Sequence, residues 1–264
     1  MRALHGAQGP WWLGIEWRGQ LTEAVLRAPT PRIDAAMVTT GAAALEVAER
    51  FGLPAPRLLG ADLQSTGVPT TLETVVQGTS DWPAPPSVER LRAAGAVLAR
   101  VHTVSLAPYE ELPFRPRPIA VDDFAADRRE GRLPSTPLLQ TADEMVTAHG
   151  VPPSEQVFLH GDVWPGNLMW AGDEIAALID WKTAGVGARG VDLSELRKQA
   201  AISFGPQAPA HVLDGYERAT STKARNVAYW DAIAALNTPT ELYDATATTR
   251  RDAFLDRAMV NLDS

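Results

Sequence analysis

Apolar and polar positions alternate along much of the first 76 residues, as they do in strands that bury one face. Residues 11–17 and 21–26 follow this pattern and are separated by a Gly-Gln pair suited to a turn. Two later runs of the same kind cover 57–63 and 70–76, and an alanine-rich stretch over 35–51 places apolar side chains at helical spacing. The pattern therefore predicts four strands and one helix in this part of the chain.

Helical periodicity dominates after a proline-rich stretch, Ser80-Asp-Trp-Pro-Ala-Pro-Pro86, which is the strongest boundary signal in the chain. Ser87 follows it and is suited to cap a helix whose apolar side chains, such as Leu91 and Leu98, lie on one face. Further helices are predicted over 138–149, 193–202, 209–219 and 225–236, and strands over 156–159, 167–170 and 175–179. A mostly β part is therefore followed by a mostly α part.

Size and composition narrow the classes of protein. With 264 residues, 45% of them hydrophobic, the chain is long enough for one large core or two modest ones. The absence of cysteine excludes disulfides, zinc-thiolate sites and thiol catalysis. A net charge of −8 without a basic run argues against a nucleic-acid partner; it suits a cationic substrate but is also ordinary for bacterial-type soluble proteins. No apolar stretch reaches eighteen residues, so we expect a cytoplasmic protein without a membrane partner; the oligomeric state stays open.

The most informative segment is His160-Gly-Asp-Val-Trp-Pro-Gly-Asn167. It places a carboxylate, Asp162, five residues before an amide, and Asp180 follows thirteen residues later after an apolar run. Kinase-type phosphoryl transfer uses a carboxylate to accept the hydroxyl proton, plus an amide and a second carboxylate to hold Mg²⁺ on the nucleotide phosphates. The same order of parts occurs in the protein-kinase signature. The set therefore points to phosphoryl transfer.

Each of these residues also has a structural interpretation. Asp162 is suited to close the turn before Pro165-Gly166, Asn167 suits a turn, and Asp180 suits a strand end. Carboxylate and amide oxygens are the hard donors that Mg²⁺ prefers, and nucleotide phosphates and water can complete its shell. Because Asn167 and Asp180 fall on adjacent strands of a predicted hairpin, we expect them to point into one space. The catalytic interpretation is therefore favoured.

The segments HGDVWPGN and LIDWKTAGVG resemble the two signature segments of the aminoglycoside phosphotransferase and choline kinase-like family. A weaker likeness extends through AVLRAP, GLPAPRLLGAD, LETVVQG and AGAVLARVH. The resemblance implies an α+β, bilobal, protein-kinase-like fold with an N-lobe over 1–78 and a C-lobe over 79–264. It also implies transfer of the γ-phosphoryl group of ATP, or GTP, to an alcohol on a small molecule, with Mg²⁺ as cofactor.

The resemblance also assigns roles to single residues. Asp162 corresponds to the catalytic base, and Asn167 and Asp180 correspond to the metal ligands. Two residues are expected to support the site structurally: His160 within the catalytic loop, and Asp192, which would tie a helix to that loop. Asp192 also begins Asp-Leu-Ser-Glu195, the spacing of a helix capping box. The adenine is expected against the hinge over 72–78, which includes Glu73, Thr74 and Val75.

The N-terminal part departs from the kinase pattern. The third strand ends in Arg27, where kinases carry a lysine that pairs with the α- and β-phosphates. The helix glutamate that orients this cation is assigned to Glu46, although counting back from the following prolines puts its position near Gly41. The glycines of the phosphate loop, at positions 6, 9 and 14, are irregular, and a proline among them lacks a backbone N–H. A catalytically impaired kinase-like protein that binds a nucleotide or a partner is therefore the second hypothesis.

A third, remote hypothesis comes from Gly185-Val-Gly-Ala-Arg-Gly190, which matches the dinucleotide fingerprint of nicotinamide-dependent oxidoreductases. No acidic residue lies about twenty positions further on, and no strand–helix alternation precedes the motif. The glycines are better explained by a tight loop after Asp180. In the helix that follows, Glu195, Arg197 and Lys198 are predicted to lie on a solvated face.

Overall fold

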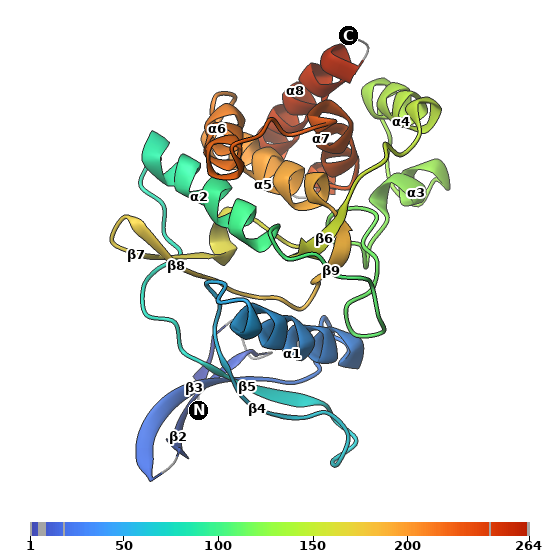
Figure 1. Ribbon diagram of the computed structural model, residues 1–264. Helices are drawn as coiled ribbons and strands as arrows, with labels where there is room; N and C mark the ends of the chain where they lie inside the picture. The colour runs from blue at the N-terminus through green and yellow to red at the C-terminus, as the bar shows by residue number, and fades with distance from the viewer. Residues whose placement is uncertain (1, 5–8, 18, 243, 263–264) are drawn as a thin grey trace.

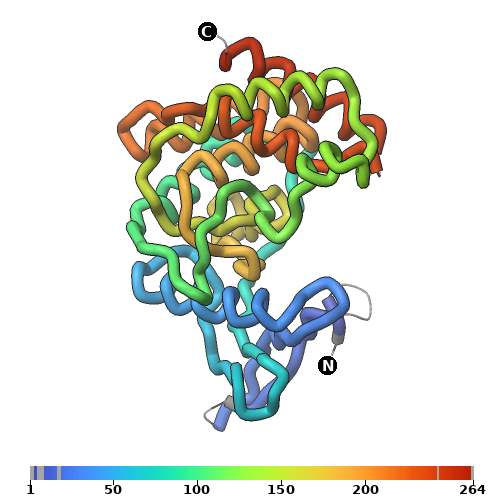
Figure 2. Tube along the Cα trace, turned by 90° about the vertical axis from the view of Figure 1, so that its right-hand side faces the viewer, coloured from blue at the N-terminus to red at the C-terminus, as the bar shows by residue number. Residues whose placement is uncertain are grey.

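The computed structural model describes residues 2–4, 9–17, 19–242 and 244–262. An antiparallel sheet with one helix forms the N-terminal part, and a larger, mainly helical part follows (Figure 1). The two parts lie one above the other in the tube view (Figure 2). The predicted α+β, two-lobed fold class is confirmed.

The N-terminal sheet has the strand order β1-β2-β3-β5-β4, and neighbouring strands are antiparallel. Helix α1 contacts β4 and β5 and lies between the sheet and the helical part (Figure 1). Asp34 begins this helix by accepting a hydrogen bond from the N–H of Met37 at 2.7 Å. The elements of this part are β1 (Arg2–Ala3), β2 (Trp11–Trp17), β3 (Gln20–Arg27), α1 (Ala35–Arg50), β4 (Leu58–Asp62) and β5 (Thr70–Thr74).

The helical part is built around α5, which contacts α2, α6, α7 and α8. Short strands precede it and carry the loops that face the N-terminal part (Figure 1). Its elements are α2 (Val88–Val101), α3 (Phe124–Arg129), α4 (Pro137–His149), β6 (Gln156–Leu159), η1 (Pro165–Asn167), β7 (Leu168–Ala171), β8 (Glu174–Leu178), β9 (Gly185–Ala188), α5 (Arg189–Phe204), α6 (Ala208–Thr220), α7 (Val227–Leu236), η2 (Thr240–Leu242) and α8 (Ala245–Leu262).

Two glycines let α2 and α6 pack main chain against main chain. A Cβ added to Gly95 would lie 2.0 Å from the carbonyl oxygen of Val212, and one added to Gly215 would lie 2.0 Å from that of Arg92. Such distances are shorter than any van der Waals contact, so no other residue fits at either position without movement. Helices α2 and α6, together with α5, contribute buried side chains to the same hydrophobic core.

The segment after β5 is fastened to the β7–β8 hairpin. Thr79 and Trp170 exchange two backbone hydrogen bonds, at 3.0 and 2.8 Å. Gly78 precedes this contact with a φ of 134°, and a Cβ there would lie 2.3 Å from the oxygen of Trp170. Glycine is therefore required where the chain passes from the sheet to the helical part.

Several predicted boundaries change in the structure. Helix α5 begins at Arg189, with Ala188 as its cap, so Asp192 lies inside its first turn and the capping-box interpretation is wrong. Helices α3 and α8 were not among the predicted elements. Helix α8 is rich in threonine, arginine and alanine, which weakens its apolar periodicity, yet it buries Phe254 and Leu255. The start of the predicted phosphate loop, residues 5–8, lies outside the described residues. Among the helices that are described, none combines the length and hydrophobicity needed to cross a membrane.

Candidate active site

The loop that the sequence predicts to be catalytic leaves β6 through a glycine that cannot be replaced without strain. Gly161 has a φ of 84°, and a Cβ there would lie 2.1 Å from the carbonyl oxygen of Thr183. The loop is thus pressed against the segment that follows Asp180, although the two are about twenty residues apart in sequence. This contact brings Asp162 and Asp180 into one region.

Asp192, from the first turn of α5, fixes the start of the catalytic loop. Its two carboxylate oxygens accept the backbone N–H groups of His160 and Gly161 at 2.8 and 2.9 Å. His102, which follows the last residue of α2, lies beside the same carboxylate, with Nε2 3.3 Å from Oδ2. Asp192 is 0% exposed, so these donors take the place of water at its oxygens. It connects the helix to the loop through these two hydrogen bonds.

His160 connects the catalytic loop to the strand that ends before Asp180. Its Nε2 lies 2.9 Å from the carbonyl oxygen of Ile179, which requires Nε2–H to donate. Nδ1 then accepts the N–H of Asp162 at 3.4 Å. Burial lowers the pKa of His160, against the opposing effect of Asp192, so the ring is neutral. A neutral ring with one donor and one acceptor fits both contacts.

Asn167 joins the same network. Its Nδ2 donates to the carbonyl oxygen of Asp162 at 2.9 Å, and its own carbonyl oxygen accepts the N–H of Ile179 at 2.9 Å. The first contact fixes the amide, so that Oδ1 is the acceptor that remains. Asp162, Asn167 and the residue before Asp180 are therefore held by direct hydrogen bonds, and the three predicted side chains come together.

Asp180 shares its carboxylate between two cations. Oδ1 accepts Nη1 of Arg27 at 2.8 Å, and Oδ2 contacts Nζ of Lys182. The backbone of Asp180 is left-handed, with a φ of 69°, so the chain turns sharply at this residue. Burial acts to raise the pKa of Asp180, but Arg27 and Lys182 outweigh it and hold the pKa below its ordinary value. Asp180 is therefore ionised.

Asp162 has the opposite shift. Its side chain is mostly buried, and burial raises its pKa; Lys182 opposes the shift and Asp180 adds to it. Nζ of Lys182 lies 3.7 Å from Oδ2 of Asp162, beyond hydrogen-bond distance but close enough for a strong charge interaction. Two neighbouring carboxylates thus have pKa values moved in opposite directions, which is the arrangement that separates acid–base roles.

Arg27 is held by a sheet residue rather than by the helix. Its Nε lies 2.7 Å from Oε1 of Glu73, on the neighbouring strand β5. Burial acts to lower the pKa of Arg27, but Glu73 and Asp180 outweigh it and raise the pKa. Glu46 lies exposed on α1, where its charge helps to raise the pKa of Tyr109. The structure therefore brings Glu73, not Glu46, to Arg27.

The other hinge residues follow directly after Glu73. Thr74 ends β5, and its Oγ1 accepts the N–H of Arg57 at 2.9 Å. Val75 comes next and is half-buried. The side chain of Glu73 is turned to Arg27.

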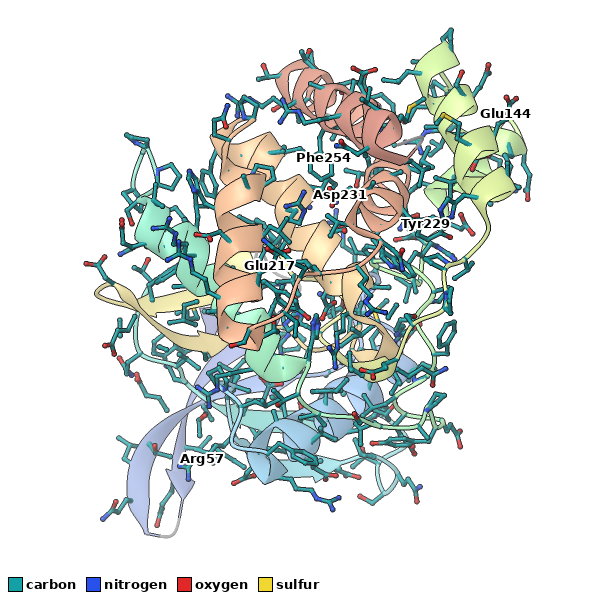
Figure 3. All side chains as sticks on the ribbon, turned by 45° about the horizontal axis from the view of Figure 1, so that its top comes forward. Arg57, Glu144, Glu217, Tyr229, Asp231 and Phe254 are labelled. Atoms are coloured by element: carbon teal, nitrogen blue, oxygen red, sulfur yellow. The ribbon has the colours of Figure 1, made fainter. Side chains whose placement is uncertain are left out.

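Three charged residues of α5 lie inside the protein, so the prediction of a solvated face is wrong. Glu195 and Lys198 are each 1% exposed and pair at 2.7 Å, and Nζ also donates to Oγ1 of Thr238 at 2.7 Å. Burial raises the pKa of Glu195, although Lys198 opposes the shift. Arg197 forms a two-pronged pair with Asp231 of α7, at 3.0 and 2.8 Å. Figure 3 labels Asp231 on this helix. The contacts with Thr238 and Asp231 join α5 to residues that come more than thirty positions later in the sequence, so a local pattern does not reveal them.

The glycine fingerprint is explained by packing against protein. A Cβ at Gly185 would lie 2.3 Å from the oxygen of Pro113, and one at Gly187 would lie 2.6 Å from that of Arg115. A Cβ at Gly190 would lie 2.0 Å from the ring of Trp230. The glycines of β9 and α5 thus make room for a neighbouring segment and a tryptophan. The glycine motif is therefore explained by contacts within the protein and not by a bound dinucleotide.

The donor set fits a metal ion that is shared with a ligand. The chemistry is one amide oxygen, from Asn167, and one carboxylate, from Asp180, both hard donors. Across the described part of the chain, no group of three or more His, Asp or Glu side chains gathers to hold a metal by itself. Such a set suits Mg²⁺ bound with a nucleotide, because phosphate oxygens and water then complete the octahedron.

Comparison with known proteins agrees with this geometry. Residues 9–236 match the family described as "Phosphotransferase enzyme family". A homoserine kinase of Bradyrhizobium sp. (strain BTAi1 / ATCC BAA-1182) is 28% identical over 123 residues, which cover 44% of this chain and 36% of that protein. The match therefore spans only about a third of the relative's length.

Two solved structures share the fold. A choline/ethanolamine kinase family protein from Mesorhizobium loti has a TM-score of 0.61 and 18% identity, over 98% of this chain and 90% of that one. An amicoumacin kinase in complex with AMP-PNP, Ca²⁺ and Ami has a TM-score of 0.63 and 10% identity, over 97% and 89%. Together with the family match over most of its length, these observations show that the chain belongs to the phosphotransferase enzyme family.

Proposed function

We propose that this protein transfers the γ-phosphoryl group of ATP, or GTP, to an alcohol group of a small molecule in a Mg²⁺-dependent reaction. The observation that carries the proposal is the hydrogen-bonded convergence of Asp162, Asn167 and Asp180, joined through Ile179 and His160. Two cations, Arg27 and Lys182, lie against the same carboxylates. A site of this composition combines a base, metal donors and phosphate-binding charge.

Asp162 acts as the base in this proposal. It accepts the proton of the acceptor hydroxyl as the new bond forms between that oxygen and the γ-phosphorus. The bond between the γ-phosphorus and the bridging oxygen breaks, and the nucleoside diphosphate leaves. Because phosphoryl transfer depends mainly on positioning and charge neutralisation, a carboxylate is basic enough. The raised pKa of Asp162 makes it a better proton acceptor than an ordinary aspartate.

The remaining residues bind and orient the nucleotide. Asn167 and Asp180 would hold Mg²⁺, which supplies positive charge to the phosphates. Arg27 would steady the α- and β-phosphates, with Glu73 keeping its guanidinium in place at 2.7 Å. The adenine would lie against the hinge over 72–78, so that residues 1–78 serve mainly the nucleotide and 79–264 the acceptor.

The acceptor class rests on the family and on the charge of the chain. Two of the similar proteins are named for small-molecule acceptors, a homoserine kinase and an amicoumacin kinase. The net charge of −8 favours acceptors that carry a positive charge, such as amino alcohols and aminoglycosides. We therefore propose a small alcohol with a cationic group as the acceptor.

The test is a screen followed by one substitution. Purified protein with Mg·ATP is assayed for ADP release against a panel of hydroxylated metabolites and antibiotics, and phosphorylated products are identified by mass spectrometry. Asp162→Asn is expected to lower kcat by about 10²- to 10⁴-fold, because it removes the proton acceptor, and to leave nucleotide binding in place. Asp173→Asn, at a position 92% exposed, is the matched control. Turnover of the Asp162→Asn variant at the wild-type rate would refute the assignment.

The alternative is a kinase-like protein that binds a nucleotide without turnover. Its motivation was three departures from the kinase pattern: Arg27 in place of a lysine, the irregular glycines and the unclear helix glutamate. The pairing of Arg27 with Glu73 answers the third, because it supplies a carboxylate from another strand. This contact supports the enzyme. Calorimetry with Mg·AMP-PNP, combined with the ADP-release screen, separates the two: binding without any acceptor-stimulated release favours the alternative.

A further inference from the structure

Lys182 lies between the two carboxylates on which the proposed reaction depends. Its Nζ contacts Oδ2 of Asp180 and lies 3.7 Å from Oδ2 of Asp162, with the side chain 22% exposed. The chain has only three lysines among 24 basic residues, so its cations are otherwise arginines. A compact ammonium on a flexible stem stands where the reacting groups would meet.

The carboxylate of Asp180 has both oxygens engaged by cations. Arg27 holds Oδ1 and Lys182 holds Oδ2. A metal ion that binds this carboxylate competes with both cations for its oxygens and repels them. Arg27 is retained by its second ion pair, with Glu73 at 2.7 Å, whereas the second neighbour of Lys182 is Asp162 at 3.7 Å. Lys182 is therefore the cation that is free to move.

Helix α1 passes close to the backbone of Lys182. Gly41 of α1 faces the backbone of Lys182, and a Cβ there would lie 3.8 Å from its Cα. Helix α1 thus presents no carboxylate at the point where it passes this residue. A small cavity separates the helix from the site, with Arg27, Gly41, Glu73, Trp181 and Lys182 in its lining. The ammonium of Lys182 is therefore held by the carboxylates of Asp162 and Asp180.

We propose that Lys182 is a catalytic residue that exchanges partners during the reaction: when metal and nucleotide bind, its ammonium passes from Asp180 to the oxygens of the transferred phosphoryl group. This inference rests on the proposed function. A metal–nucleotide complex carries a net negative charge, so an ammonium released from Asp180 is attracted to its phosphate oxygens. The displaced ammonium then neutralises the group that moves between the nucleotide and the alcohol.

The first test uses the small number of lysines. An acyl phosphate of ATP, which acylates lysines close to the bound phosphates, is incubated with the protein and the sites are mapped by mass spectrometry. We expect acylation of Lys182 that excess Mg·AMP-PNP prevents. Lys223 is exposed and serves as the internal control, with labelling that the nucleotide does not prevent. Absence of nucleotide-protected labelling at Lys182 would overturn the inference.

The second test compares Lys182→Met with the matched control Lys223→Met. Mn²⁺ binding without nucleotide, measured by electron paramagnetic resonance, is expected to become tighter in Lys182→Met, because the competing cation is gone. Binding of Mg·AMP-PNP, measured by calorimetry, is expected to become weaker by about tenfold, because one charge-assisted hydrogen bond is lost. A merely structural lysine would move both affinities in the same direction, and that result would contradict the exchange.

The wild-type protein separates this inference from the function on which it rests. If the wild-type protein binds no Mg·AMP-PNP, the proposed function fails and the inference fails with it. If the wild-type protein binds the nucleotide and the Lys182→Met variant binds Mn²⁺ and Mg·AMP-PNP as the wild type does, only the role of Lys182 is lost. Lys182→Arg keeps the charge and is expected to restore part of the nucleotide affinity.

Discussion

Glu73 on β5 holds the guanidinium of Arg27 on β3, with Oε1 2.7 Å from Nε. The two strands are paired so that Val25 lies opposite Glu73, which puts Arg27 diagonally across from the glutamate on the same face of the sheet. The cation is therefore oriented within the sheet, where kinases use a lysine paired with a helix glutamate. The orientation of the Arg27 guanidinium therefore does not depend on a glutamate of helix α1.

This arrangement predicts different effects for two glutamates. Glu73→Gln removes a buried partner of Arg27 and is expected to weaken Mg·AMP-PNP binding about tenfold, and to lower the free energy of unfolding by about 2 kcal/mol. Glu46→Gln, on the exposed face of α1, is the control and should change neither quantity. Calorimetry and urea unfolding measure the two effects. Equal weakening by both substitutions would contradict the sheet-based pair.

Asp192 should be among the most sensitive positions for stability. Asp192→Ala leaves the N–H groups of His160 and Gly161 without their acceptor in a buried region, and we expect a loss of about 3 kcal/mol in the free energy of unfolding. Asp173→Ala removes an exposed ion pair with Arg90 and should cost less than about 1 kcal/mol. Urea titration of both variants gives the comparison. A cost for Asp192→Ala as small as that for Asp173→Ala would mean that water replaces the lost carboxylate.

Because His160 is buried, we expect the protein to lose stability in mild acid. Burial lowers its pKa in the folded protein below the ordinary value of 6.5. The unfolded chain therefore takes up a proton first, so the contribution is fully present above pH 6.5 and is lost as the pH falls through and below that value. His160→Gln keeps a donor for the oxygen of Ile179 but does not titrate. The difference in Tm between pH 7.5 and pH 5.5 should be smaller in His160→Gln than in the wild type.

Asp162 predicts the acid limit of activity. Its pKa is raised by burial above the ordinary value of 3.8, and below the raised pKa the protonated carboxyl has no capacity to accept the hydroxyl proton. The kcat/KM for the acceptor should therefore fall as the pH drops, with an apparent pKa above the ordinary aspartate value. Lys182 opposes the shift, so Lys182→Met should move this acid limb to higher pH. A limb that stays in place would show that another group controls it.

Gly190 tests the packing explanation of the glycine fingerprint. Gly190→Ala places a methyl group 2.0 Å from the ring of Trp230, and overpacking of this kind is expected to cost about 1–3 kcal/mol. Gly14→Ala, where an added Cβ meets no atom within 4 Å, is the control and should not destabilise the protein. Thermal unfolding measures both. A neutral Gly190→Ala would show that Trp230 moves freely out of the way.

Local patterns predicted the elements on which the site is built. The alternation over 11–17 matches β2, and the run over 156–159 matches β6. Ser87 caps α2 as expected, by accepting the N–H of Arg90 at 3.1 Å. Such features depend on neighbouring residues, so a sequence reveals them. The first turn of α5 was missed because Arg189-Gly-Val resembles a loop; in the structure Gly190 packs against Trp230 of α7.

The sequence by itself determined the order and chemistry of the proposed reacting groups, since Asp162, Asn167 and Asp180 lie within one stretch of a recognisable motif. Only the tertiary structure decided which partners the cations have. Arg27 meets a strand 46 residues later and a carboxylate 153 residues later. The direction of Lys182 and the burial of the Glu195–Lys198 pair likewise depend on sheet register and helix packing. Long-range ion pairs are set by how distant surfaces meet, and no local propensity encodes that.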